Sequence, residues 1–245
     1  MSGALELAGI YQHVRGRMAL SDIGLALQEG DWLLIVGPNG AGKSLLMRLI
    51  LGLDQPSAGS VRILGQDLAR LGGRAMQRLR CQMGAVLQGG SLLAGATVLD
   101  NLLLPLRDAP ISRREMARAA RLVMTLLQLD GLENHQPRAL SLGQQRLVEL
   151  ARALIHQPPL LVWDGFSHGL DPNAISQTQA KQGKQRENRN LTLIVTDNRA
   201  DVLTDAAHRI AVLDRGRLLF DGPAAALEPA SATRLELRAA LWGRP

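Results

Sequence analysis

The octapeptide GPNGAGKS at residues 37–44 constrains the fold of this chain more than any other feature. It fits the pattern G-x-x-x-x-G-K-[ST], follows the apolar run DWLLIVG at 31–37, and opens a segment with helical apolar spacing. A buried strand, a glycine-rich turn and a helix in this order predict a phosphate-binding loop in an α/β fold. The glycines let backbone N–H groups face phosphate oxygens, and the start of the helix adds a positive dipole.

Two side chains of this loop have predicted roles of their own. Lys43 is placed to reach the terminal phosphates of a nucleotide, and Ser44 to offer its hydroxyl to Mg²⁺. The predicted nucleotide-binding residues of the loop are Gly37, Pro38, Asn39, Gly40, Ala41, Gly42, Lys43 and Ser44.

The rest of the chain supports an α/β fold. PPLLVWD (158–164) and LTLIVTD (191–197) are two more apolar runs typical of buried strands, and HRIAVLDRGRLLFDG (208–222) predicts two short strands around a DRG turn. Strands separated by helical stretches favour a mainly parallel sheet. Between them, residues 89–150 have helical spacing, which predicts an inserted helical subdomain.

One helix of this subdomain is especially well defined. Ser112 and Glu115 have capping-box spacing, and Ile111 and Met116 stand where a hydrophobic staple would place them. One apolar face then follows at Met116, Ala120, Val123 and Leu127.

Composition narrows the function classes. The balance of 46% apolar and 20% charged residues is that of a globular protein, and the net charge of +6 is spread along the chain. With only 2% aromatic residues, base stacking on a single strand is disfavoured, and we expect no nucleic-acid partner. The single cysteine, Cys81, excludes a disulfide framework. No signal peptide or membrane-spanning run is visible, so any work on a membrane is expected to use a partner.

A second set of motifs indicates a family. LSLGQQ (140–145) begins a helix 23 residues before Asp164, counted from Ser141. With it, the sequence resembles the nucleotide-binding domain of ABC transporters over nearly its whole length. The matching motifs are the Walker A loop GPNGAGKS, the Q-loop VLQGGSLL with Gln88, the signature with Ser141, Leu142, Gly143 and Gln144, the Walker B strand LLVWD with Asp164, the D-loop GLDP with Asp171, and the closing stretch LDRGRLLFDGPAAAL.

The resemblance implies an α/β P-loop NTPase (RecA-like) ABC nucleotide-binding domain with a small antiparallel β part and an inserted helical subdomain. It implies ATP and Mg²⁺ as ligands, the metal near Ser44, Gln88 and Asp164, and adenine stacked on Tyr11, 26 residues before Gly37. The expected organisation is a single domain over 1–245. Its parts are an ATP-binding core at 1–88 and 151–228, a signature subdomain at 89–150 and a C-terminal tail at 229–245.

The same resemblance implies partners. Two such domains pair head to tail, and a permease is gripped through the region 84–108, at the cytoplasmic face of the bacterial inner membrane. Within the family, GAVLQGGSLLAGATVLDNLLLPLRD looks like the ATPases of Mla-type phospholipid transporters, which work with MCE-domain lipid-binding proteins. That likeness is carried by Val98, Asp100, Asn101, Pro105, Leu106 and Arg107. The alternative is an importer or exporter ATPase for another substrate.

Two departures from the family's pattern concern hydrolysis. Gly165 stands where the family has the glutamate that polarises the attacking water, and Asp197 where it has the switch histidine. General-base help is worth about 10²–10⁴ in rate, so hydrolysis is expected to be weak or absent. Asp197 as a substitute base, and His168 as another, are disfavoured alternatives.

Two more departures concern closure and packing. Leu142 replaces a signature glycine and could obstruct pairing with the opposing subunit, while the polar run at 173–190 replaces an amphipathic helix. A transporter subunit with slow hydrolysis and a non-catalytic regulatory subunit gated by ATP both fit this pattern. A homodimer and a heterodimer also remain open. DNA-repair and translation ABC proteins are disfavoured, because the chain lacks their coiled-coil insertion and second cassette.

Overall fold

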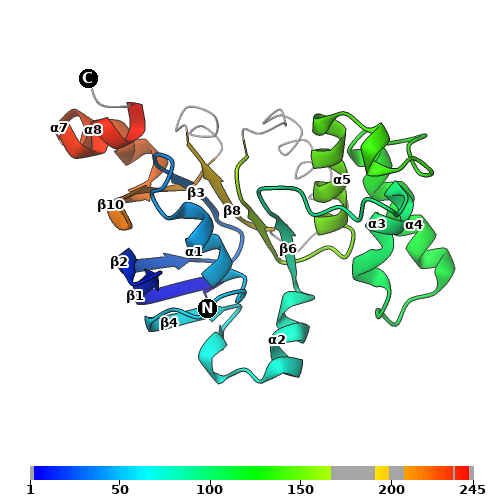
Figure 1. Cartoon of the computed structure of the whole chain (residues 1–245), viewed down its shortest axis with the longest axis horizontal. Helices are drawn as coiled ribbons and strands as arrows, with labels where there is room; N and C mark the ends of the chain where they lie inside the picture. Colours follow the sequence, from blue (N-terminus) through cyan, green and yellow to red (C-terminus); the bar gives the residue numbers. More distant parts are fainter. Residues whose placement is uncertain (1–2, 167–190, 199–206, 234, 243–245) are drawn as a thin grey trace.

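The computed structural model describes residues 3–166, 191–198, 207–233 and 235–242. Three features singled out in the sequence, Asp171, His168 and the run 173–190, lie outside the described residues. In the described part, a body with two sheets lies beside a group of helices, drawn in green in Figure 1.

The central sheet has six strands in the order β10-β9-β3-β8-β7-β6. All neighbouring pairs are parallel except β10 with β9, which is antiparallel. The strands are β3 (Trp32–Val36), β6 (Met83–Val86), β7 (Leu160–Trp163), β8 (Thr192–Asp197), β9 (Arg209–Asp214) and β10 (Arg217–Pro223). The strands predicted at 31–37, 158–164, 191–197 and 208–222 are therefore confirmed.

A smaller antiparallel sheet of order β2-β1-β4-β5 packs against one face of the central sheet. Its strands are β1 (Leu5–Val14), β2 (Arg17–Leu27), β4 (Ala58–Ile63) and β5 (Gln66–Asp67). This is the small antiparallel part that the predicted fold class requires, although the apolar pattern had not located β1 and β2. Helix α1 (Lys43–Ile50) buries its apolar side in the core that this sheet shares with one face of the central sheet.

The central sheet separates two hydrophobic cores. Leu33 and Ile35 of β3 belong to the core with α1, whereas Leu34 and Val36 belong to the core with the helical part. Successive side chains of a strand point to opposite faces, so a strand that is buried on both sides must be apolar throughout. This is why these strands are continuous apolar runs in the sequence.

The helical part follows β6 in the chain. Its elements are α3 (Val98–Leu103), η2 (Leu104–Leu106), α4 (Arg113–Leu126), η3 (Pro137–Ala139) and α5 (Leu142–Leu154). The capping box at Ser112 and Glu115 is present at the start of α4, and Ala120, Val123 and Leu127 are buried, as predicted. The other helices in the described residues are η1 (Leu68–Arg70), α2 (Gly73–Arg80), η4 (Ala224–Ala226), α7 (Leu227–Thr233) and α8 (Leu235–Trp242).

Within the ranges described, no helix is both long enough and apolar enough to cross a bilayer. Cys81 is a free thiol on the surface.

Candidate nucleotide-binding site

The loop between β3 and α1 has a backbone that only glycine accommodates at key points. Gly37 has φ of +157°, and a Cβ atom there would lie 1.9 Å from the carbonyl oxygen of Leu213. Gly42 has φ of +105° and precedes α1 without a side-chain cap. Because the first turn of α1 contains no acidic side chain, its N–H groups and dipole are available to an anion.

Lys43 is the first residue of α1 and is only 9% exposed. Its Nζ donates hydrogen bonds to the carbonyl oxygens of Gly37 (2.7 Å) and Pro38 (3.0 Å) and to Oδ1 of Asn198 (2.8 Å). Burial lowers the pKa of Lys43, and the charges of Asp164 and Asp197 oppose that shift. The ammonium group is thus held inside the loop by neutral oxygens that an incoming phosphate can replace.

Asp164 follows β7 and is 5% exposed. The hydroxyl of Thr196, on the neighbouring strand β8, donates to Oδ1 of Asp164 (2.6 Å) and accepts from the N–H of Gly165 (2.9 Å). This arrangement fixes the carboxylate at the carboxyl edge of the parallel sheet, where ligands of open α/β sheets bind.

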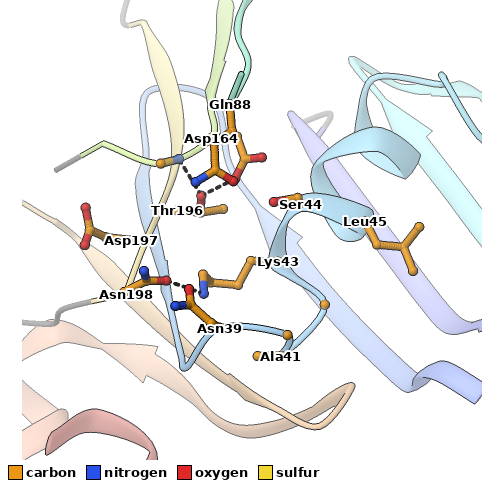
Figure 2. A pocket seen from close by; sticks show the side chains of 13 residues that line it. Asn39, Ala41, Lys43, Ser44, Leu45, Gln88, Asp164, Thr196, Asp197 and Asn198 are labelled. Carbon is orange, nitrogen blue, oxygen red and sulfur yellow. Dashed lines mark hydrogen bonds between the residues drawn. The ribbon is translucent and has the colours of Figure 1, made fainter. Parts of the chain in front are cut away.

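These groups meet in one cavity of about 240 Å³. Figure 2 shows Lys43 facing Asn198 and Asn39, with Ser44, Gln88 and Asp164 further along the wall. The lining consists of Asn39, Gly40, Ala41, Gly42, Lys43, Ser44, Leu45, Gln88, Asp164, Gly165, Thr196, Asp197 and Asn198. The hydroxyl, amide and carboxylate oxygens of Ser44, Gln88 and Asp164 are the hard donors that Mg²⁺ prefers, so the residues present fit the metal.

Most predicted site residues line this cavity, and Gly37 and Pro38, which are not in the lining, are linked to it through the hydrogen bonds of their carbonyl oxygens with Lys43. Two further groups are not brought together with them. Among the described residues, the lining of the cavity does not include Tyr11, which lies in β1 opposite Ala58 of β4. The signature residues are also separate. Ser141 and Gln144 form a capping box that starts α5, Gly143 lies in its first turn, and Leu142 is 79% exposed.

Positions 165 and 197, which the sequence analysis singled out, both line the cavity. Gly165 has φ of +76°, a left-handed conformation that side chains other than glycine rarely adopt, and a Cβ atom there would lie 3.4 Å from Nε2 of Gln88. Asp197 is 1% exposed at the end of β8. Both positions therefore contribute to the surface of the cavity.

Two residues of the site had escaped the motif analysis. Thr196 orients Asp164, and Asn198 contacts the ammonium group of Lys43. Both lie at the end of β8, beside β7 and β3, and the polar residues TDN directly after the apolar run LTLIV were the available signal.

The order of these motifs and the fold around them match a known family. Residues 20–166 match the family described as "ABC transporter". The chain belongs to the ABC transporter family. The described part has the fold of an ABC nucleotide-binding domain, as predicted.

Relatives and solved structures agree with this assignment. The chain is 34% identical to the "Methionine import ATP-binding protein MetN" of Latilactobacillus sakei, over 91% of this chain and 65% of that protein. It is 36% identical to the protein of the same name from Ralstonia nicotianae, over 88% of this chain and 63% of that protein. The chain thus spans slightly less than two thirds of these curated relatives.

Among solved structures, the dimeric bacterial ABC transporter cassette MJ0796 covers 90% of this chain and 98% of its own, with a TM-score of 0.80 and 28% identity. A post-hydrolysis dimer of the same cassette, bound to ADP and phosphate, has a TM-score of 0.79. The cbiO1 protein of Clostridium perfringens covers 97% of this chain and 98% of its own with a TM-score of 0.78, and at 20% identity it supports the fold alone.

The predicted likeness to the Mla-type phospholipid transporters is corrected by these relatives, whose names refer to methionine import. The structure gives a physical reason. Asn101 is fully buried, and its side chain forms hydrogen bonds with the backbone of Leu93 and Thr97, while Pro105 lies in the first turn of the short helix η2. Local packing requires residues of this kind, so their pattern does not distinguish a lipid-transport subfamily. The MCE-domain partner has no support for the same reason.

Proposed function

We propose that this chain is a subunit that binds ATP with Mg²⁺ at the loop 37–44 and transmits the binding to a membrane permease. The observation that carries the proposal is the convergence of Lys43, Ser44, Gln88 and Asp164 on one cavity beside the start of α1. Bound Mg²⁺ would neutralise phosphate charge. Lys43 would exchange its contacts with Gly37, Pro38 and Asn198 for phosphate oxygens, while Thr196 keeps Asp164 oriented.

Hydrolysis by the chain itself is proposed to be slow. Gly165 supplies no carboxylate to orient a water, and Asp197 places an acid where a phosphate would need a donor. A second candidate function follows from the same observation. In a non-catalytic regulatory subunit, ATP would act as a ligand that favours closure of a dimer, and turnover would be irrelevant.

The transported substrate is proposed from the relatives. Because the relatives above are named for methionine import, a small amino acid such as methionine is the first candidate. The proposed partners are a second ABC subunit, identical or different, and a permease that holds the chain at the cytoplasmic face of the bacterial inner membrane. The dimeric solved cassette supports pairing of this kind.

Equilibrium binding of ATP–Mg²⁺ together with ATP turnover tests the nucleotide function. Lys43→Ala should weaken ATP binding by roughly 100-fold, because several charge-assisted hydrogen bonds to phosphate are lost. Arg48→Ala is the matched control, since Arg48 lies on the same helix and pairs with Asp54 at the surface. Equal ATP affinity in the wild type and both variants would refute binding at this loop.

Uptake of labelled methionine tests the substrate. Cells that lack the chain should lose uptake, and the wild-type gene should restore it whereas the Lys43→Ala gene should not. Unchanged methionine uptake would reject this substrate class and leave the nucleotide function standing.

A further inference from the structure

A charged cluster on α5 lies outside the cavity and is used by none of the roles above. Glu149 is 2% exposed, and burial of an ionised carboxylate is costly unless it is paired and hydrogen-bonded. Its neighbours on the same face of the helix are Arg146 and Arg152, three residues away on each side. The buried carboxylate of Glu149 therefore requires hydrogen-bond partners in addition to the nearby arginines.

Those partners belong to the segment that contains Gln88. Oε1 of Glu149 accepts from the backbone N–H of Ser91 (2.5 Å) and from its hydroxyl (3.1 Å). Oε2 of Glu149 accepts from Nη1 of Arg146 (2.7 Å), which also donates to the carbonyl oxygen of Leu87 (2.9 Å). Nη1 of Arg152 donates to the carbonyl oxygen of Ser91 (2.7 Å), and Nη2 of Arg152 contacts its hydroxyl.

Helix α5 thus holds the chain on both sides of Gln88. Between the two anchors, Gly89 and Gly90 have φ of +102° and +82°, and no atom lies within 4 Å of where their Cβ atoms would be. Because glycines in open space have little conformational preference, the path of this backbone is set by the hydrogen bonds at its two ends, Leu87 and Ser91. Figure 1 shows α5 beside the chain that leaves β6.

We infer that Glu149 is a positioning residue that sets the place of Gln88 in the cavity through Ser91. The inference rests on the proposed function, because it gives Gln88 a part in binding Mg²⁺ with ATP. The backbone of Gln88 is then coupled to α5, whose first turn carries the signature residues. Groups that orient a metal ligand typically change metal affinity by about 10–100-fold when they are removed.

The test is Glu149→Gln, which keeps the shape of the side chain and removes its charge. Hydrogen exchange of the amides at 87–91 should be faster in this variant without any nucleotide. Binding of a non-hydrolysable ATP analogue should weaken about 10-fold with Mg²⁺ and stay unchanged in EDTA. Glu115→Gln is the matched control, because Glu115 caps α4 in the same helical part and should leave both measurements unchanged.

A double-mutant cycle with Gln88→Ala separates positioning from a merely structural role. If Glu149 acts through Gln88, the Mg²⁺-dependent loss in Glu149→Gln should vanish in the Gln88→Ala background. Additive losses would overturn the inference, as would unchanged exchange at 87–91. If Glu149→Gln fails to fold, Ser91→Ala serves the same cycle, because it removes only the hydroxyl contacts.

Failure of the inference and failure of the proposed function are distinguishable. A wild-type chain that binds no ATP refutes the proposed function, and with it any role of Gln88 toward Mg²⁺. Exchange at 87–91 in the absence of nucleotide would still report whether Glu149 anchors the segment. Tight ATP binding with no Mg²⁺-dependent effect of Glu149→Gln refutes the inference alone.

Discussion

The loop between β3 and α1 and the ends of β7 and β8 form two sides of one cavity, and they differ in how their functional groups are made. The loop side is mostly backbone, shaped by glycines such as Gly37 and Gly42, with Lys43 held inside it. The strand side depends on single side chains at or just after the ends of two apolar strands, namely Asp164, Thr196 and Asp197.

This difference underlies the proposal that the loop keeps ATP binding while the residues at 165 and 197 slow hydrolysis. A substitution in the loop collides with backbone, since a Cβ atom at Gly37 would overlap the carbonyl of Leu213. By contrast, a Cβ atom at Gly165 would meet only side-chain atoms of Gln88, the nearest at 3.4 Å, so a substitution there changes the chemistry of the cavity without overlapping the backbone of another segment. The fold therefore restricts which residues the loop can contain. On the strand side, the residue at 165 can change the reactivity of the cavity at a smaller cost to stability.

The largest effect is expected from Gly37→Ala. Its methyl group would lie 1.9 Å from a backbone oxygen, so either the loop or β9 has to move. We expect ATP binding to be lost and the unfolding free energy to fall by several kcal/mol, on the order of severe overpacking. Thermal unfolding and ATP titration measure both. Gly72→Ala is the control, because Gly72 lies outside the cavity lining, has φ of −73° and has no atom within 4 Å of a Cβ, and a near-normal Gly37→Ala protein would contradict the comparison.

The second-largest effect is expected on the strand side of the cavity, at Gly165. Gly165→Glu supplies the carboxylate whose absence is proposed to slow hydrolysis, and we expect turnover to rise by about 10-fold or more. The left-handed backbone at this position should cost the variant about 1–2 kcal/mol of stability. Gly165→Gln is the matched control, since it carries the same strain without a base. Equal turnover in both variants would show that Asp197, Leu142 or an absent partner is limiting.

A smaller effect is expected at Asn198. Asn198→Asp would place a carboxylate beside Nζ of Lys43, which now lies 2.8 Å from the amide oxygen. The new ion pair competes with phosphate for the lysine, so ATP affinity should fall by about 10-fold. Asn198→Ala removes the contact without adding charge and should have a weaker effect on ATP titration. Tighter binding in Asn198→Asp would show that Asn198 does not face the phosphate.

The smallest effect on stability is expected at Leu142. Because this side chain is 79% exposed, Leu142→Gly should change the unfolding free energy by about 1 kcal/mol or less, the usual cost of glycine in a helix. If the leucine obstructs pairing, dimer formation with ATP, followed by light scattering, should become stronger. Leu122→Gly is the control for lost apolar surface, because Leu122 is also an exposed leucine but lies on a different helix, α4.

The sequence predicted features that form a local pattern and missed those that depend on contacts between distant segments. The apolar runs that became β3, β7 and β8 were evident because strands buried on both faces must be apolar throughout. Strands β1 and β2 were not located, because residues such as Glu6 and Gly9 interrupt the apolar run of β1. The strand becomes evident only from its hydrogen-bonded pairing with β2. Thr196 and Asn198 were missed because they belong to no motif, and the sheet alone brings them to Asp164 and Lys43.

By itself, the sequence determined the loop, the buried strands and the residues present or missing at 165 and 197, because each is a local pattern or a single identity. Only the tertiary structure decided that Gly165 is left-handed, that Asn198 contacts Lys43, and that three charged residues of α5 hold the segment around Gln88. Those contacts join residues 58 to 155 positions apart along the chain, and hydrogen bonds over such separations leave no periodicity in a sequence.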